Sequence, residues 1–108
     1  MNKEMQIAIE KAYSSIILYR EALTNAFLNG YISLDVKMKS DLFFTANFLE
    51  RVLAGEQQQP TCTDKQYIDR ECATLDAMCM LYPEQFEAVK PQLEAIEKAF
   101  ATWQSILN

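Results

Sequence analysis

We expect an all-α fold, an antiparallel bundle of four amphipathic helices, because turn-forming residues are scarce and apolar residues recur at helical spacing. The 108 residues include only two glycines and three prolines, which leaves few places for the tight turns of a many-stranded sheet. Half of the residues are hydrophobic and 23% are charged, a composition typical of a folded globular chain rather than a disordered one. We therefore treat residues 1–108 as a single helical domain.

The first helix is predicted over about residues 3–29. Apolar residues recur there at alternating spacings of four and three, which is typical of a helix with one buried face. They are Met5, Ile9, Ala12, Ile16, Tyr19, Leu23 and Ala26. Asn29-Gly30 ends this pattern, and glycine is the usual residue after a helix because it accepts a left-handed backbone.

The second helix is predicted over about residues 34–54. Its beginning alternates apolar and polar residues as a strand would, but a lone strand has no partner for its backbone groups. Ser33 is a suitable N-cap, Asp35 suits a first helical turn and Gly55 suits the end. We expect its bundle-facing side to be Met38, Leu42, Ala46, Leu49, Val52 and Leu53.

A polar linker over residues 55–63, broken by Pro60, precedes the third helix. Thr63 is the predicted N-cap of a helix over about residues 64–81. The apolar positions of this helix and its end are Ile68, Cys72, Leu75, Cys79 and Tyr82.

The fourth helix is predicted over about residues 84–107. Its apolar positions are Phe86, Val89, Leu93, Ile96, Phe100, Trp103 and Leu107. Because proline removes a backbone donor, a break near Pro83 or Pro91 would divide this segment and give five helices in place of four.

The short connections favour an antiparallel bundle within one chain. The alternative is a pair of helical hairpins that completes its core only as a dimer, since the spacing of apolar residues fits both arrangements.

The residue types needed for common catalytic sites are missing. The chain has no histidine, which excludes Ser-His-Asp and Cys-His catalysis and the metal sites that use histidine. It also lacks the glycine-rich loops that bind nucleotide phosphates. The pairs Glu84/Glu87 and Glu94/Glu97 have helical spacing, but no second, aspartate-ending pair follows them as it does in magnesium-dependent helical pyrophosphohydrolases. We therefore expect no enzyme activity, no metal and no cofactor, and keep a carboxylate-dependent metal enzyme as a third hypothesis.

Three cysteines, Cys62, Cys72 and Cys79, form no CxxC pair. Cys72 and Cys79 lie two helical turns apart, about 10 Å, which is too far for a disulfide. We expect both in the core, whereas a pairing of Cys62 with either stays open. No apolar run is long enough to span a membrane and the first residues lack the pattern of a signal peptide, so we expect a cytoplasmic protein without membrane contact.

The formal charge of −5 and pI of about 4.6 argue against direct binding of nucleic acid. The excess lies in residues 56–108, which contain four basic and nine acidic residues. Acidic side chains on outer helical faces support one alternative function: a nucleic-acid mimic, encoded by a phage or mobile element, that inhibits a DNA- or RNA-handling protein.

One stripe of the second predicted helix does not fit a single buried face. At about 100° per residue, Phe44 and Phe48 point away from Leu42. Charged residues bracket the two rings, so that the full stripe reads Lys37, Asp41, Phe44, Phe48 and Arg51. An apolar centre with a charged rim is typical of a protein interface, although a helix packed on two sides would bury the rings internally.

Our first hypothesis is a non-enzymatic interaction module, such as an adaptor, regulator or inhibitor of the kind found among bacterial or phage accessory proteins. The stripe of Lys37, Asp41, Phe44, Phe48 and Arg51 would bind another protein or a second copy of the chain.

Overall fold

The computed structural model describes residues 2–57 and 59–107, and the all-α prediction is confirmed over this part of the chain. Its elements, in order, are α1 (Lys3–Leu28), α2 (Leu34–Lys39), α3 (Phe43–Leu53), α4 (Cys62–Leu81), α5 (Pro83–Phe86), the short 3-10 helix η1 (Glu87–Val89) and α6 (Lys90–Leu107).

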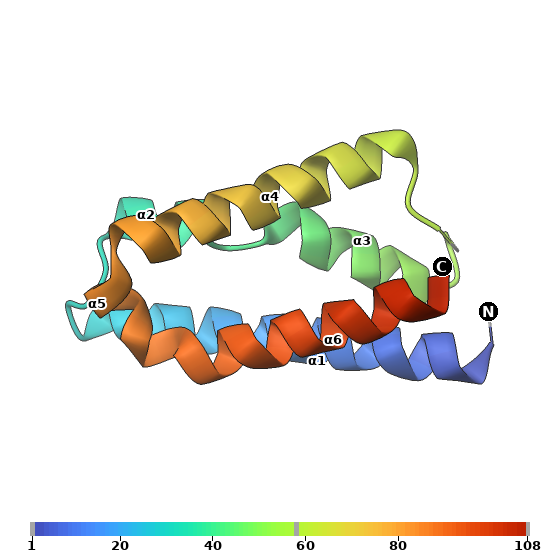
Figure 1. Cartoon of the computed structure of the whole chain (residues 1–108), viewed down its shortest axis with the longest axis horizontal. Coiled ribbons are helices and arrows are strands. Elements are labelled where there is room, and N and C mark those ends of the chain that lie inside the picture. Colours follow the sequence, from blue (N-terminus) through green and yellow to red (C-terminus); the bar gives the residue numbers. More distant parts are fainter. Residues whose placement is uncertain (1, 58, 108) are drawn as a thin grey trace.

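The helices lie along one long axis, and the molecule measures 42 × 24 × 22 Å. In Figure 1, α1 and α6 lie side by side, with the beginning of α1 and the end of α6 at the same end of the molecule. Helix α3 packs against α1 on one side and against α4 on the other, whereas α4 packs mainly on α3 and α5. Helix α3 is therefore central and α4 is peripheral.

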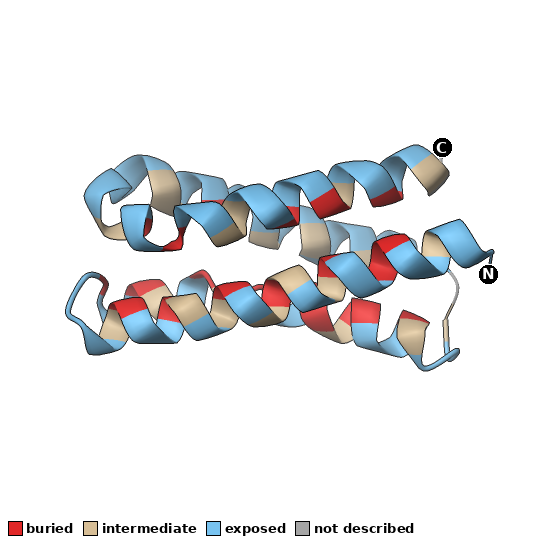
Figure 2. Ribbon diagram, turned by 90° about the horizontal axis from the view of Figure 1, so that it is seen from below, coloured by how far each residue is buried: buried red, intermediate tan, exposed pale blue. Residues whose placement is uncertain are grey.

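The core forms where α1, α3 and the last segment meet, and Figure 2 shows buried residues on the sides of α1 and α6 that face the interior. The predicted apolar side of the first helix is confirmed: Ile9, Ala12, Ile16, Tyr19, Leu23 and Ala26 are buried, and Met5 is half-buried. In the last segment Phe86, Val89, Ile96 and Trp103 are buried while Leu93 and Phe100 are half-buried. The side chain of Leu107 lies outside the part that is described.

Helix α1 begins after an Asn2 cap and ends at the predicted Asn29-Gly30. The Asn2 side chain accepts a hydrogen bond from the Met5 amide at 2.7 Å, which satisfies one of the unpaired donors at the start of a helix. After Leu28, Gly30 adopts a φ of +80°, a conformation that glycine accepts without steric cost.

The single helix predicted over residues 34–54 is wrong. Ser40, Asp41 and Leu42 separate α2 from α3, and Leu42 has a left-handed φ of 56°. Ser33 does cap α2, through a 3.2 Å hydrogen bond from the Val36 amide. Because the break changes the direction of the chain, Met38 is 67% exposed and Val36 is the buried residue of α2.

Helix α4 begins two residues before the predicted start, with Thr61 rather than Thr63 as its N-cap. The Thr61 hydroxyl accepts from the Asp64 amide at 3.1 Å, and the Asp64 carboxylate accepts from the Thr61 amide at 2.9 Å. This reciprocal pair satisfies two backbone donors at once. Gln58, in the predicted linker, lies outside the described residues.

The apolar side of α4 is buried only in part, contrary to the prediction of a full core face. Leu75 is buried, Ile68 and Cys79 are half-buried, and Cys72 and Tyr82 are exposed. The reason is that α4 is peripheral and packs mainly on α3 and α5. All three cysteines are free, so neither open pairing of Cys62 is present.

The single helix predicted over residues 84–107 is wrong, and the structure has the alternative of a break near the prolines. Pro83 opens the short α5, η1 follows, and α6 begins at Lys90 with Pro91 in its first turn. Proline is tolerated there because the amide that it lacks would have no partner inside the helix. In residues 2–57 and 59–107, no helix has both the length and the apolar character needed to cross a membrane.

Candidate functional site: the aromatic surface of α3 and α4

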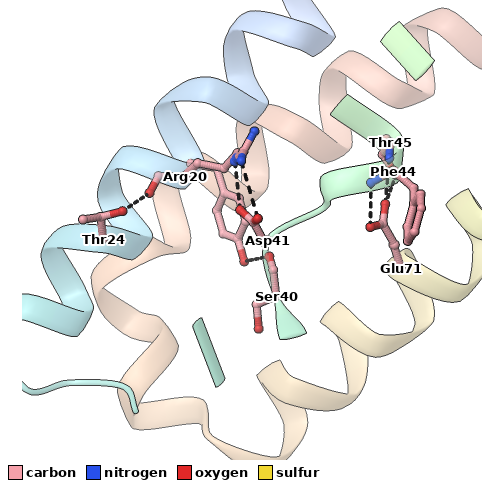
Figure 3. Close-up of polar contacts among 8 residues, drawn as sticks. Arg20, Thr24, Ser40, Asp41, Phe44, Thr45 and Glu71 are labelled. Carbon is pink, nitrogen blue, oxygen red and sulfur yellow. Dashed lines mark hydrogen bonds and ion pairs between the residues drawn. The ribbon is translucent and has the colours of Figure 1, made fainter. Parts of the chain in front are cut away.

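The start of α3 is unusual because its N-cap residue, Leu42, has no side chain that can accept a hydrogen bond. Glu71 of α4 supplies the acceptors instead, as Figure 3 shows. Its carboxylate accepts from the Phe44 amide at 2.9 Å, the Thr45 amide at 2.7 Å and the Thr45 hydroxyl at 2.7 Å. Negative charge at the start of a helix also interacts favourably with the helix dipole. Glu71 therefore joins α4 to the first turn of α3.

Helix α1 holds the break from the other side. The buried hydroxyl of Tyr19 donates to the Ser40 carbonyl at 2.9 Å. Arg20 pairs with Asp41, with 2.8 Å between Nε and Oδ1 (Figure 3). All three residues of the break are thus held, two by hydrogen bonds from α1 and Leu42 by burial of its side chain.

These contacts position an exposed group of rings on α3 and α4, which we call the aromatic surface and define as Phe43, Phe44, Tyr67 and Arg70. Phe44 stacks on Tyr67 with 4.6 Å between ring centroids and 21° between planes, and Phe43 meets Phe44 edge-on at 5.5 Å. The Arg70 guanidinium lies 5.8 Å from the Tyr67 ring centroid. Phe43 and Phe44 stay 50% and 47% exposed, so this surface faces solvent.

Of the two rings in the predicted stripe, only Phe44 reaches the surface. Phe48 is 1% exposed, and its ring centroid lies 5.7 Å from that of Trp103 in α6. For Phe48 the alternative of internal packing is therefore correct, and its proposed exposure is wrong. Phe44 and Phe48 lie on one side of α3, but α6 covers only the second of them.

The three charged residues of the predicted stripe are not brought together around these rings. Lys37 lies half-buried on α2, before the break. Asp41 lies in the break and pairs with Arg20. Arg51, near the end of α3, pairs with Asp64 of α4 at 3.1 Å. The prediction assumed one continuous helix over residues 34–54. Because the chain breaks at Leu42, residues of α2 and α3 do not share one helical face.

Tyr67, Arg70 and Glu71 were missed by the sequence reasoning. They lie on the side of α4 that faces α3, and their spacing of three and four residues places them on one helical face. An exposed aromatic residue three positions before an arginine was an available signal. The contact of Glu71 with Phe44 and Thr45, 27 and 26 residues away, had no local signal.

Neither Cys72 nor Cys79 lies in an environment that activates a thiol. Burial is the largest cause that raises the pKa of both Cys72 and Cys79, and the charge of nearby Asp76 is the next largest. A raised pKa disfavours the reactive thiolate. Within residues 2–57 and 59–107, no three cysteine or carboxylate side chains gather closely enough to hold a metal ion.

Comparison of the chain with protein-family models, with curated proteins and with solved structures finds no match in any of the three.

Proposed function

We propose that this chain is a non-enzymatic protein-interaction module, an adaptor, regulator or inhibitor, and that its aromatic surface is the docking site. The partner is another protein that presents an apolar side chain beside a carboxylate. Phe43 and Phe44 offer apolar area for the first, and the guanidinium of Arg70 offers a partner for the second.

The observation that carries the proposal is the preorganised exposure of three rings, in which Phe44 contacts both Phe43 and Tyr67. Aromatic residues and arginine are enriched at the energetic centres of protein interfaces. The stacking of Phe44 on Tyr67, together with the Glu71 contacts to the same turn, holds the rings in one arrangement. A surface ordered before binding loses less entropy when a partner docks.

The rest of the site agrees with a binding role. Burial raises the pKa of the Cys72 and Cys79 thiols, which makes them poor nucleophiles. We further propose a cytoplasmic location, supported by three free cysteines, which persist in reducing compartments.

The test compares partner capture by the wild-type chain and by the Phe43→Ser, Phe44→Ser double variant, each used as bait in lysate of the source cells. The matched control is Leu18→Ser, Leu28→Ser, which removes two leucines that are 57% and 72% exposed on α1. We expect at least one protein to bind the wild type and the control but not the aromatic variant. Circular dichroism checks that all three baits keep their helices.

Equal capture by the aromatic variant and the wild type would remove the aromatic surface as the docking site. The solution mass of the wild type and the aromatic variant, measured by light scattering, tests the alternative that a second copy is the partner. A dimer that the double variant abolishes would replace the heterologous partner with a second copy.

A further inference from the structure

Helix α4 carries a second surface on the side opposite its aromatic residues. Lys65, Asp69, Cys72 and Asp76 follow one another at spacings of four, three and four residues, so they form one stripe along the helix. At about 100° per residue, Asp69 points roughly 160° away from Tyr67. This stripe therefore faces α6 rather than α3, and all four of its residues are exposed.

Helix α6 supplies the facing wall. A cavity of about 470 Å³ lies between α4 and α6 near the end of the molecule, and Lys65, Asp69, Trp103 and Gln104 are among the residues that line it. Farther along, burial is the main cause that raises the pKa of the Cys79 thiol. The negative charges of Asp76 of α4 and Glu97 of α6 raise this pKa further. Each of the two helices thus has a carboxylate near the same cysteine.

Apolar residues of both helices are also only half covered, and Ile68 among them lines the cavity. Ile68 and Cys79 of α4 and Leu93 and Phe100 of α6 pack against the core yet stay half-buried. We call the whole feature the α4–α6 groove: these four floor residues with walls Lys65, Asp69, Cys72, Asp76, Glu97 and Gln104. It exists because α4 packs on α3 and α5 and leaves its α6 side open.

The walls are acidic, with Asp69, Asp76 and Glu97 against the single Lys65. Carboxylates on both edges of an apolar floor complement a helix that has one apolar stripe flanked by lysine or arginine. The same charges oppose a second copy of this acidic chain and the phosphates of a nucleic acid, because like charges repel across an interface.

We propose that the α4–α6 groove binds a basic amphipathic helix of a partner protein. The stretch from Lys65 to Cys79 spans about 21 Å at 1.5 Å per residue, which matches about four turns of the bound helix. This partner helix adds to the bundle along α4 and α6, covers the floor and pairs its cations with the three carboxylates. The site is separate from the aromatic surface on the other side of α4.

The probe is a synthetic helical peptide of about 16 residues with leucine on one face and lysine on both flanks. Its counterpart has glutamate in place of every lysine. Fluorescence anisotropy should show that the lysine peptide binds the full chain, that added salt weakens binding and that the glutamate peptide binds at least tenfold more weakly. Bound peptide should also slow alkylation of Cys72 severalfold, measured by mass spectrometry.

The variant Asp69→Asn, Asp76→Asn, Glu97→Gln should weaken binding of the lysine peptide at least tenfold. The matched control is Glu21→Gln, Glu50→Gln, Glu56→Gln, which removes the same number of exposed carboxylates elsewhere and should bind as the wild type does. The Phe43→Ser, Phe44→Ser variant should also bind normally, so a failure here is distinguishable from a failure of the aromatic surface.

Three results obtained with the peptides would overturn the proposal. They are equal affinity for the two peptides, equal weakening by the two triple variants, and alkylation of Cys72 at an unchanged rate with peptide bound. Protection of Cys72 that rises with protein concentration in the absence of peptide would assign the groove to a second copy and would also overturn it.

Discussion

The left-handed backbone at Leu42 shapes the site more than any other single residue does. Such a conformation costs about 1–2 kcal/mol in a residue with a side chain, and glycine would avoid that cost. The Leu42 side chain is buried in the core, however, and glycine would lose that burial. The hydrogen bonds around the break offset the strain, so the turn and the core are stabilised together.

Glu71→Ala should destabilise the chain by about 2 kcal/mol, because it removes the acceptor for two amides and one hydroxyl at the start of α3. Urea denaturation followed by circular dichroism measures the change. Asp69→Ala, on the same helix but facing away from α3, should change stability by less than about 0.5 kcal/mol. A similar loss of stability in both variants would show that any such substitution weakens α4, and that the lost Glu71 contacts to α3 are not the cause.

The second prediction at the residue scale concerns pH. Burial raises the pKa of Tyr19 far above its ordinary value, and nearby Cys79 and Asp41 raise it further. In the unfolded chain the phenol ionises near pH 10, so the unfolded state loses its proton first and stability falls as the pH rises above about 10. Below that pH the contribution is fully present.

Tyr19→Phe removes this titration and also the hydrogen bond to the Ser40 carbonyl. We expect it to be less stable than the wild type by about 1–2 kcal/mol at pH 7, with a smaller further loss between pH 9 and pH 11. Thermal unfolding across that range measures both effects. If the variant loses as much stability as the wild type between pH 9 and pH 11, groups other than Tyr19 control that loss.

At the scale of the helices, the spacing of apolar residues predicted the buried positions well where a helix packs on one continuous face. The positions of α1 from Ile9 to Ala26 are buried as the spacing indicates. The α2–α3 break could not be predicted in full from the sequence. Ser40 and Asp41 are helix-capping residue types and were a usable signal, but the acceptor that caps α3 comes from Glu71, far along the chain.

The two rings of the predicted site differ for the same physical reason. Phe44 and Phe48 share a side of α3, and no local rule says that Trp103 covers one of them while the other stays half exposed. The three phenylalanines of this helix were the sequence signal that indicated an aromatic surface. Which ring is exposed depends on where α4 and α6 lie, a tertiary property that spacing alone does not contain.

Helix α4 should be the least stable of the long helices. Only Leu75 is buried among its 20 residues, whereas α1 buries residues along most of its length. Local opening is easier where few apolar contacts are lost. In native-state hydrogen exchange we expect the amides of α4 to exchange at least tenfold faster than those in the middle of α1, with the slowest α4 amides around Glu71 and Leu75. Equal protection of the two helices would contradict a peripheral α4.

At the scale of the whole molecule, exposed apolar side chains are unevenly distributed. Among the side chains that the structure describes, twelve large apolar ones are exposed. Seven of them lie at the end of α1, on α2 and the connection before it, and at the end of α4, at the left of Figure 1. They are Leu28, Tyr31, Leu34, Met38, Met80, Leu81 and Tyr82. A hollow lined by Tyr31, Val36 and Tyr82 shows that the α1–α2 connection and the end of α4 meet there. We call this group of seven the apolar end.

The apolar end favours association of copies, and the formal charge of −5 opposes it. Because about 1 M salt shortens the screening length to roughly 3 Å, salt should remove the repulsion and leave the apolar attraction. We therefore expect the mass from light scattering to rise with protein concentration at high salt and to stay at one chain at low salt.

Met38→Ser, Met80→Ser should suppress this salt-dependent association, since these side chains are 67% and 82% exposed at the apolar end. The folded state should lose less than about 0.5 kcal/mol, because neither methionine contributes to the core. Leu18→Ser changes a side chain of α1 that is 57% exposed and lies outside the apolar end; it is the matched control and should associate as the wild type does. If the double variant associates as readily as the wild type, or if Leu18→Ser suppresses association equally, the attraction lies elsewhere on the surface.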